Sequence, residues 1–222
     1  MKQKLNKHKA NFDDMEILPM FPSQSQKLLR KETVLQTFDY KLFGEIGEVE
    51  DYFDLIDALN YASPEDEFII RIHSGGGLLG TADVIINAIQ NTQARVHGHI
   101  ESLCGSASTM IFLACHSYSV SPRAEFFVHT ASSGVIGKEH ENYSSIMFSR
   151  KRIHNLIKDT YEGFLTTQEI ENVLNGQDYY FDATEVSDRL ESYTERQQEK
   201  FMQEMEQQEK EDASPVKKQL LS

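Results

Sequence analysis

The stretch IIRIHSGGGLLGTADVIINAI, residues 69–89, places three consecutive glycines between an apolar run and an amphipathic pattern. The apolar run predicts a buried strand, and the spacing after the glycines predicts a helix from Leu78 to Ile89. Glycine loses more backbone entropy on folding than any other residue, so three in a row indicate a need for bare backbone. That need could be a phosphate cradle, a tight turn, or a set of amide donors facing a reacting carbonyl.

The alternation of strand and helix patterns extends through the middle of the chain. Apolar or aromatic runs predict strands at residues 37–46, 67–72, 94–100, 116–120 and 124–129. Apolar spacings of three and four predict helices at residues 49–62, 78–89, 106–114 and 138–164. Two further helix starts are predicted by capping-box spacing in TTQE (166–169) and DATE (182–185). Strands alternating with helices predict an α/β fold built from βαβ units.

The two ends of the chain differ in composition from its middle. Residues 1–33 are polar and interrupted by prolines, so they are predicted to form an N-terminal arm. Residues 34–190 carry the strand and helix patterns and are predicted to form the compact domain. Half of residues 189–212 are charged, and residues 191–222 are predicted to form a charged C-terminal tail, either a solvated helix or disordered.

The composition argues against several classes of function. A net charge of −13 argues against a nucleic-acid surface, which needs a basic stripe. The longest apolar run, residues 110–115, is too short to span a membrane, and the polar first residues show no signal peptide. Cys104 and Cys115 lie in apolar sequence and are predicted to be reduced core residues. We therefore expect a soluble, cytoplasmic protein with no nucleic-acid or membrane partner.

The glycines can be compared with two known binding loops. A phosphate loop requires a lysine after its last glycine, and none follows here. A dinucleotide loop requires the spacing Gly-x-Gly-x-x-Gly, which Gly75, Gly77 and Gly80 satisfy, with Glu101 at about the distance of a ribose-binding acid. This short pattern leaves the nucleotide interpretation open, together with a simple strand-to-helix turn.

Three polar residues further along the chain suggest another use for the glycines. Ser106 stands among small residues at the start of a predicted apolar helix, where the helix dipole is positive and a substrate backbone can approach. His129 ends an apolar strand, and Asp178 precedes an aromatic strand. Taken singly, they would be interpreted as a helix cap, a structural histidine and a turn residue. Their order and spacing, however, match those of one family.

The sequence resembles the proteolytic subunit of the Clp protease, ClpP, and its phage relatives over about residues 38–190. The family's Asn-Ser-Pro-Gly-Gly segment is matched by HSGGG (73–77), and its serine segment by CGSAS (104–108). Its histidine and aspartate segments are matched by FVHTA (127–131) and QDYYFDA (177–183). The sequence departs from the family's patterns at His73, Gly75, Thr130 and Ala131.

The resemblance implies a serine endopeptidase. Its fold would be the ClpP/crotonase-like α/β fold of repeated β-β-α and βαβ units with a protruding handle helix. Ser106 would be the nucleophile, His129 its general base, and Asp178 the residue that orients the imidazole. The backbone amides of Gly76 and Ala107 would bind the oxyanion. This chemistry requires no metal or cofactor.

The choice of nucleophile among Ser102, Ser106 and Ser108 rests on the residues that follow. The family has an alanine and then a glycine eight and nine residues after its serine. Ala114 and Cys115 hold those places when they are counted from Ser106, and counting from Ser108 would misplace them. The resemblance therefore selects Ser106.

The resemblance also implies how substrate is held and how subunits assemble. An extended polypeptide would bind as a strand beside Gly77, Leu78, Ser133 and Gly134. Residues 138–164 correspond to the family's handle, through which two rings interlock, so a homo-oligomeric heptameric ring, single or doubled, is expected. Its substrates would be intracellular proteins delivered by an AAA+ unfoldase. A phage-type relative that processes capsid or scaffold proteins would need no unfoldase.

Two other functions are compatible with the same sequence. A catalytically inactive ClpP-like ring subunit would keep the fold and the assembly, because sequence does not show whether the three side chains are aligned. A crotonase-type acyl-CoA enzyme shares the fold and a backbone oxyanion hole, but it would not need the Ser/His/Asp set.

Overall fold

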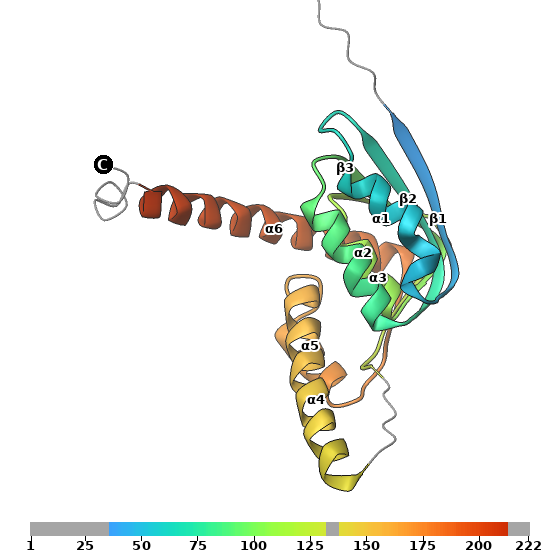
Figure 1. Ribbon diagram of the computed structural model, residues 1–222, viewed down its shortest axis with the longest axis vertical. Coiled ribbons are helices and arrows are strands. Elements are labelled where there is room, and N and C mark those ends of the chain that lie inside the picture. Colours follow the sequence, from blue (N-terminus) through green and yellow to red (C-terminus); the bar gives the residue numbers. More distant parts are fainter. Residues whose placement is uncertain (1–35, 132–137, 213–222) are drawn as a thin grey trace, which may run out of the picture. The chain divides into compact units, whose positions relative to one another are not determined.

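The computed structural model describes residues 36–131 and 138–212 of the 222-residue chain (Figure 1). Its strands are β1 (Thr37–Ile46), β2 (Glu67–Gly77), β3 (Arg95–Gly105), β4 (Ser117–Val120), β5 (Glu125–Val128) and β6 (Tyr179–Asp182). Its helices are η2 (Val49–Tyr52), α1 (Phe53–Asn60), α2 (Leu79–Asn91), α3 (Ala107–Leu113), α4 (Glu139–Tyr161), α5 (Thr167–Leu174) and α6 (Ala183–Asp212). The predicted α/β fold class is confirmed.

The strands form one six-stranded sheet within the described residues. Its order is β1-β2-β3-β5-β6, and β4 pairs with an earlier part of β3 than β5 does. The pairs among β1 to β5 are parallel, whereas β6 runs antiparallel to β5. Parallel neighbours must be joined by crossover connections, and α1, α2 and α3 supply them. The carboxyl ends of β2, β3 and β5 consequently meet at one edge of the sheet.

The core lies where alternate residues of the strands meet the helices. In β2, the side chains of Phe68, Ile70 and Ile72 are fully buried, as expected for one face of a strand. Both predicted core cysteines are free and buried in this core. Helix α3 is buried along its whole length, so the element that follows Ser106 is held on all sides. This helix gives the serine a rigid support.

The three glycines continue β2 instead of forming the turn that the sequence suggested. The strand was expected to end at residue 72, but it runs through Gly77, where Gly76 and Gly77 pair with the end of β1. A Cβ on Gly77 would lie 2.2 Å from the carbonyl oxygen of Ile46. The two backbones therefore approach too closely for any side chain. The glycines do not form an open nucleotide loop, and Glu101 is engaged by Arg71 at 3.0 Å.

The predicted capping boxes are both present. Thr166 caps α5 by accepting from the Glu169 amide, and the Glu169 carboxylate accepts from the Thr166 amide in return. At the start of α6, the Asp182 carboxylate accepts from two amides and the Glu185 carboxylate accepts from the Asp182 amide. Each box satisfies amides that helix geometry leaves without partners.

The Glu169 carboxylate also joins α5 to α6 through Arg189. The guanidinium donates to both carboxylate oxygens, at 2.7 and 3.0 Å, and lies over the ring of Phe181. Burial by itself would raise the pKa of Glu169, but the hydrogen bonds from Arg189 and Thr166 outweigh it and lower the pKa. Because the folded pKa is depressed, the ion pair stabilises the fold above the ordinary value of 4.5 and loses that contribution as the pH falls through the folded value.

Replacing Glu169 with glutamine is expected to lower the free energy of unfolding by about 1–2 kcal/mol at pH 7. Glutamine can still complete a capping box, so the loss of stability comes mainly from removing the negative charge that pairs with Arg189. The difference from wild type should shrink as the pH is lowered from 5 toward 3, measured by urea unfolding. Glu171→Gln, at an exposed position of the same helix, is the matched control. A loss that stays constant across this range would contradict the assignment.

The two long helices differ from their predicted bounds. Helix α4 ends at Tyr161, three residues before the predicted end, because Gly163 adopts a φ of 92° and turns Phe164 into the core. Helix α6 crosses residue 190 without interruption and continues to Asp212 (Figure 1). Tyr193, three residues after the boundary proposed at residue 190, is buried on this helix. Residues 1–33 and 213–222 lie outside the described residues.

Candidate active site

Ser106 occupies the turn between β3 and α3. Its φ and ψ are 53° and −127°, and no other non-glycine residue in the described ranges has a positive φ. Such a conformation costs on the order of 1–3 kcal/mol and persists only where the surroundings enforce it. A strained strand-to-helix turn that presents a serine hydroxyl is the geometry of a nucleophile elbow.

The turn is held by contacts with two neighbouring strands. The Ser106 amide donates to the Phe127 carbonyl of β5 at 2.9 Å. On the other side, a Cβ on Gly76 would lie 2.6 Å from the Ser106 Cβ and 2.8 Å from the Gly105 carbonyl oxygen. The glycine at position 76 therefore allows β2 to approach the Ser106 turn more closely than any other residue would.

His129 lies directly beside the serine. It follows β5, and its Nε2 is 2.8 Å from the Ser106 Oγ. The parallel pairing of β3 with β5, which aligns Gly105 with Phe127, brings the two side chains to the same edge of the sheet. The imidazole stacks on the Phe127 ring with 4.8 Å between centroids, and Phe127 stacks in turn on Tyr180. The ring stack limits the orientations open to the imidazole.

Asp178 directly precedes β6 and His129 directly follows β5, but the two side chains are not bonded. The antiparallel pairing of β5 with β6 ends at Val128 opposite Tyr179, and one further step sets His129 opposite Asp178. Asp178 is exposed, and among the described residues its carboxylate makes no hydrogen bond with the imidazole. The backbone thus places the aspartate, but this conformation leaves its side chain in solvent.

The other candidate nucleophiles near the turn lack the histidine contact that Ser106 makes. Ser102 is exposed on β3. Ser108 is fully buried, and its Oγ is bonded to the Gly105 amide and to carbonyl oxygens of Gly105 and Ser74. Burial raises the pKa of the Cys104 thiol, so this cysteine is not a thiolate near neutral pH. Among these residues, only Ser106 is paired with a histidine.

The two predicted oxyanion donors lie beside the serine but differ in their availability. Ala107 is the first residue of α3, a position whose amide has no acceptor within the helix. The Gly76 amide was expected to point into the space above Ser106. It donates instead to the Ser74 hydroxyl at 3.1 Å. In this conformation the α3 amide is therefore the available donor, and the glycine amide is held by its own strand.

A cavity of about 560 Å³ opens beside the serine and histidine. Of the predicted substrate contacts, Gly77 and Leu78 line it, whereas Ser133 and Gly134 lie outside the described residues. Its apolar wall comes from α3 and α4: Met110, Ile153, Leu156 and Ile157. The sequence pattern marks these four residues as apolar positions of helices, but it gives no indication that they face a site.

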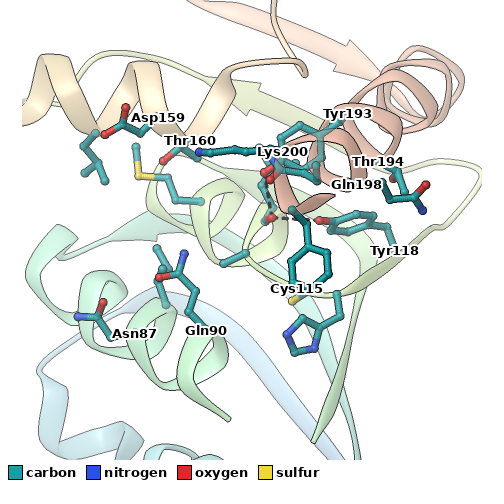
Figure 2. Close-up of a pocket in the computed structure, with 18 of the residues that line it drawn as sticks. Asn87, Gln90, Cys115, Tyr118, Asp159, Thr160, Tyr193, Thr194, Gln198 and Lys200 are labelled. Atoms are coloured by element: carbon teal, nitrogen blue, oxygen red, sulfur yellow. Dashed lines mark hydrogen bonds between the residues drawn. The ribbon is translucent and has the colours of Figure 1, made fainter. Parts of the chain in front are cut away.

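A larger cavity of about 880 Å³ lies among α2, α3, α4 and α6 (Figure 2). It shares Met110 and Leu156 with the first cavity. The dashed lines in Figure 2 mark hydrogen bonds. The hydroxyls of Tyr118 and Tyr193 both donate to the Leu113 carbonyl. The residues that line this cavity include His116 but no serine, whereas Ser106 and His129 both line the smaller cavity.

The described ranges contain neither a metal-ligand cluster nor a membrane-spanning helix. No group of three or more His, Cys, Asp or Glu residues there is placed to hold a metal ion. None of the helices in residues 36–131 and 138–212 combines the length and the hydropathy of a membrane span.

Comparisons with known proteins agree with the fold described above. The family model described as Clp protease matches residues 48–189. A solved structure of a ClpP1 mutant from Listeria monocytogenes superposes with a TM-score of 0.54 at 23% sequence identity, covering 68% of this chain and 86% of that one. A search of curated proteins finds no match. The matched segment contains all three predicted catalytic residues and spans well over half of the chain, which therefore belongs to the Clp protease family.

Proposed function

We propose that this protein is a serine endopeptidase in which Ser106, His129 and Asp178 act as a catalytic triad. The observation that carries the proposal is the 2.8 Å contact between the His129 Nε2 and the Ser106 Oγ, made at a strained turn. Membership of the Clp protease family supports peptide-bond hydrolysis as the reaction. Ser108, whose hydroxyl is bonded to backbone groups, has no such histidine partner.

The chemistry follows from the positions of the two side chains. As the Ser106 oxygen attacks a peptide carbonyl, the His129 Nε2 accepts its proton and then transfers it to the departing amine. A water molecule activated by the same imidazole then hydrolyses the acyl-enzyme. Asp178 would accept a hydrogen bond from the other ring nitrogen and stabilise the imidazolium. This step requires the exposed Asp178 carboxylate to turn toward the ring.

The oxyanion would be bound by the amides of Ala107 and Gly76. Each such donor is commonly worth about 3 kcal/mol of transition-state stabilisation. The Ala107 amide lies at the positive end of α3. The Gly76 amide would exchange its bond with Ser74 for a bond with the oxyanion, a change that requires rotation of one peptide plane in β2.

The substrate would be an extended polypeptide. Its backbone would lie along Gly77 and Leu78, and the apolar wall of the cavity would receive an apolar side chain. Assembly into a homo-oligomeric ring, heptameric and single or doubled, would enclose these sites. Exposed apolar residues on α4 support an assembly contact there: Tyr143, Ile146, Met147 and Phe148.

The proposal is tested by covalent labelling with a fluorophosphonate probe. Wild type is expected to be labelled once per chain, and Ser106→Ala is expected to abolish the label. Ser108→Ala serves as the control, because its hydroxyl is buried and already bonded. Loss of labelling in Ser108→Ala with retention in Ser106→Ala would overturn the choice of nucleophile. Acyl-CoA binding by an unlabelled wild type would favour the crotonase chemistry.

A second function, that of a catalytically inactive ring subunit, is favoured by two observations. The Asp178 carboxylate is exposed, and the Gly76 amide is bonded to Ser74. Substitution of Asp178 distinguishes the alternatives. Asp178→Asn is expected to lower kcat of a working triad by about 10⁴-fold. An assembled wild-type ring that is neither labelled nor able to cleave peptides would establish the inactive subunit.

A further inference from the structure

The strained conformation of Ser106 raises the question of what holds each of its two dihedral angles. The angle φ is restrained through the preceding peptide group, because the Ser106 amide donates to the Phe127 carbonyl at 2.9 Å. The angle ψ depends on the direction of the Ser106 carbonyl. That carbonyl must therefore have partners of its own if the turn is to keep its shape.

Thr109 provides both partners of the Ser106 carbonyl. Its backbone amide donates to the Ser106 oxygen at 3.0 Å, and its Oγ1 donates to the same oxygen at 2.6 Å. Threonine in a helix can adopt two χ1 rotamers, and only a hydroxyl directed at the carbonyl makes this bond. Some further contact must select that rotamer.

Tyr161 supplies that contact from the last residue of α4. Its hydroxyl lies 2.5 Å from the Thr109 Oγ1, and both side chains are fully buried. A threonine hydroxyl carries one hydrogen, which here goes to a carbonyl that can only accept. The tyrosine hydroxyl is therefore the donor in this pair. Burial raises the pKa of the Tyr161 phenol, so the donor keeps its proton at any working pH.

We infer that Tyr161 and Thr109 are positioning residues for the nucleophile. The tyrosine hydroxyl fixes the threonine rotamer, the threonine hydroxyl fixes the Ser106 carbonyl, and that carbonyl sets the angle from which Oγ faces His129. The chain of bonds connects the end of α4 to the Ser106 carbonyl across 55 positions of sequence. The inference rests on the proposed serine peptidase, since it assigns a role to these hydroxyls in that reaction.

A purely structural role predicts a different result from a positioning role. If the two buried hydroxyls served only as hydrogen-bond partners for each other, removing one would lower the free energy of unfolding and leave turnover unchanged. Tyr118 provides the comparison, because its hydroxyl also bonds a carbonyl, that of Leu113, the last residue of α3. Tyr118→Phe removes a comparable hydrogen bond that does not reach Ser106.

The experiment compares Tyr161→Phe and Thr109→Val with two controls, Thr109→Ser and Tyr118→Phe. Tyr161→Phe and Thr109→Val are expected to lower kcat for a fluorogenic peptide by about 10- to 100-fold with KM nearly unchanged, as displacement of a reacting group does. Thr109→Ser retains the hydroxyl and should restore most of kcat. The double variant should lose no more than the worse single variant, because the bonds act in series.

A second measurement does not depend on activity. Hydrogen exchange of the amides in residues 105–110 is expected to be at least about tenfold faster in Tyr161→Phe than in Tyr118→Phe, because the turn loses its restraint. If wild type fails to cleave peptides, the proposed function fails while the exchange data still test the restraint. Equal exchange in the two phenylalanine variants, or turnover lost equally in both, would overturn the positioning role.

Discussion

Replacing Ser106 with alanine is expected to lower kcat for peptide hydrolysis by about 10⁴- to 10⁶-fold, without loss of the folded protein. The reason is chemical, because the variant has no nucleophile to form the acyl-enzyme. The side chain is only partly buried, and its Oγ makes its side-chain contact with His129, so removing one oxygen leaves the core intact. Initial rates with a fluorogenic peptide and a thermal unfolding curve measure the two quantities.

The histidine substitution tests whether the two residues act as one unit. His129→Ala is expected to cost nearly as much as Ser106→Ala, and the double variant no more than either. This non-additivity arises because neither residue contributes without the other. Losses that multiplied in the double variant would show that the two side chains work independently, contrary to the shared hydrogen bond.

Replacing Gly76 with alanine is expected to have the second large effect, on both stability and catalysis. Its φ of 100° is unfavourable for alanine, and the added Cβ would lie 2.6 Å from the Ser106 Cβ and 2.9 Å from the Ala107 nitrogen. We expect a loss of about 3–5 kcal/mol in the free energy of unfolding. Any variant that stays folded must shift the turn, so kcat should fall by at least about 10²-fold.

The neighbouring glycine provides the control for this prediction. A Cβ on Gly75 would come no closer than 3.9 Å to its nearest neighbour, a methyl carbon of Leu103. Gly75→Ala is therefore expected to change the free energy of unfolding by less than about 1 kcal/mol. Urea unfolding of both variants decides the matter. Similar stabilities for the two would mean that β2 does not press against the nucleophile turn as the structure indicates.

The sequence correctly indicated the elements that carry the site. Alternating apolar residues located β3 and β5, and capping-box spacing located the starts of α5 and α6 within a residue. These signals are local, because periodicity and capping depend on residues within one or two turns of each other. The local pattern failed at the glycines, where the close approach of β1 extends β2 through Gly77.

The candidate site shows the same division between local and distant causes. Ser106 and His129 were chosen from motifs, and the structure brings them within hydrogen-bond distance. The direction of the Gly76 amide and the exposure of Asp178 were not predictable, because each depends on the rotation of one peptide group or one side chain. The alternative conformations differ in free energy by only a few kcal/mol, and the residue type does not show which one is adopted.

The fold class, the family and the residue types available for catalysis could all be inferred before any coordinates, because they follow from short-range patterns and ordered motifs. Which serine meets a histidine depends on the folded chain, since that meeting requires β3 and β5 to pair in one register. The same holds for Tyr161, 55 positions beyond Ser106, which joins the serine's chain of hydrogen bonds only through packing. Contacts between distant segments depend on how whole elements pack, and no local pattern encodes them.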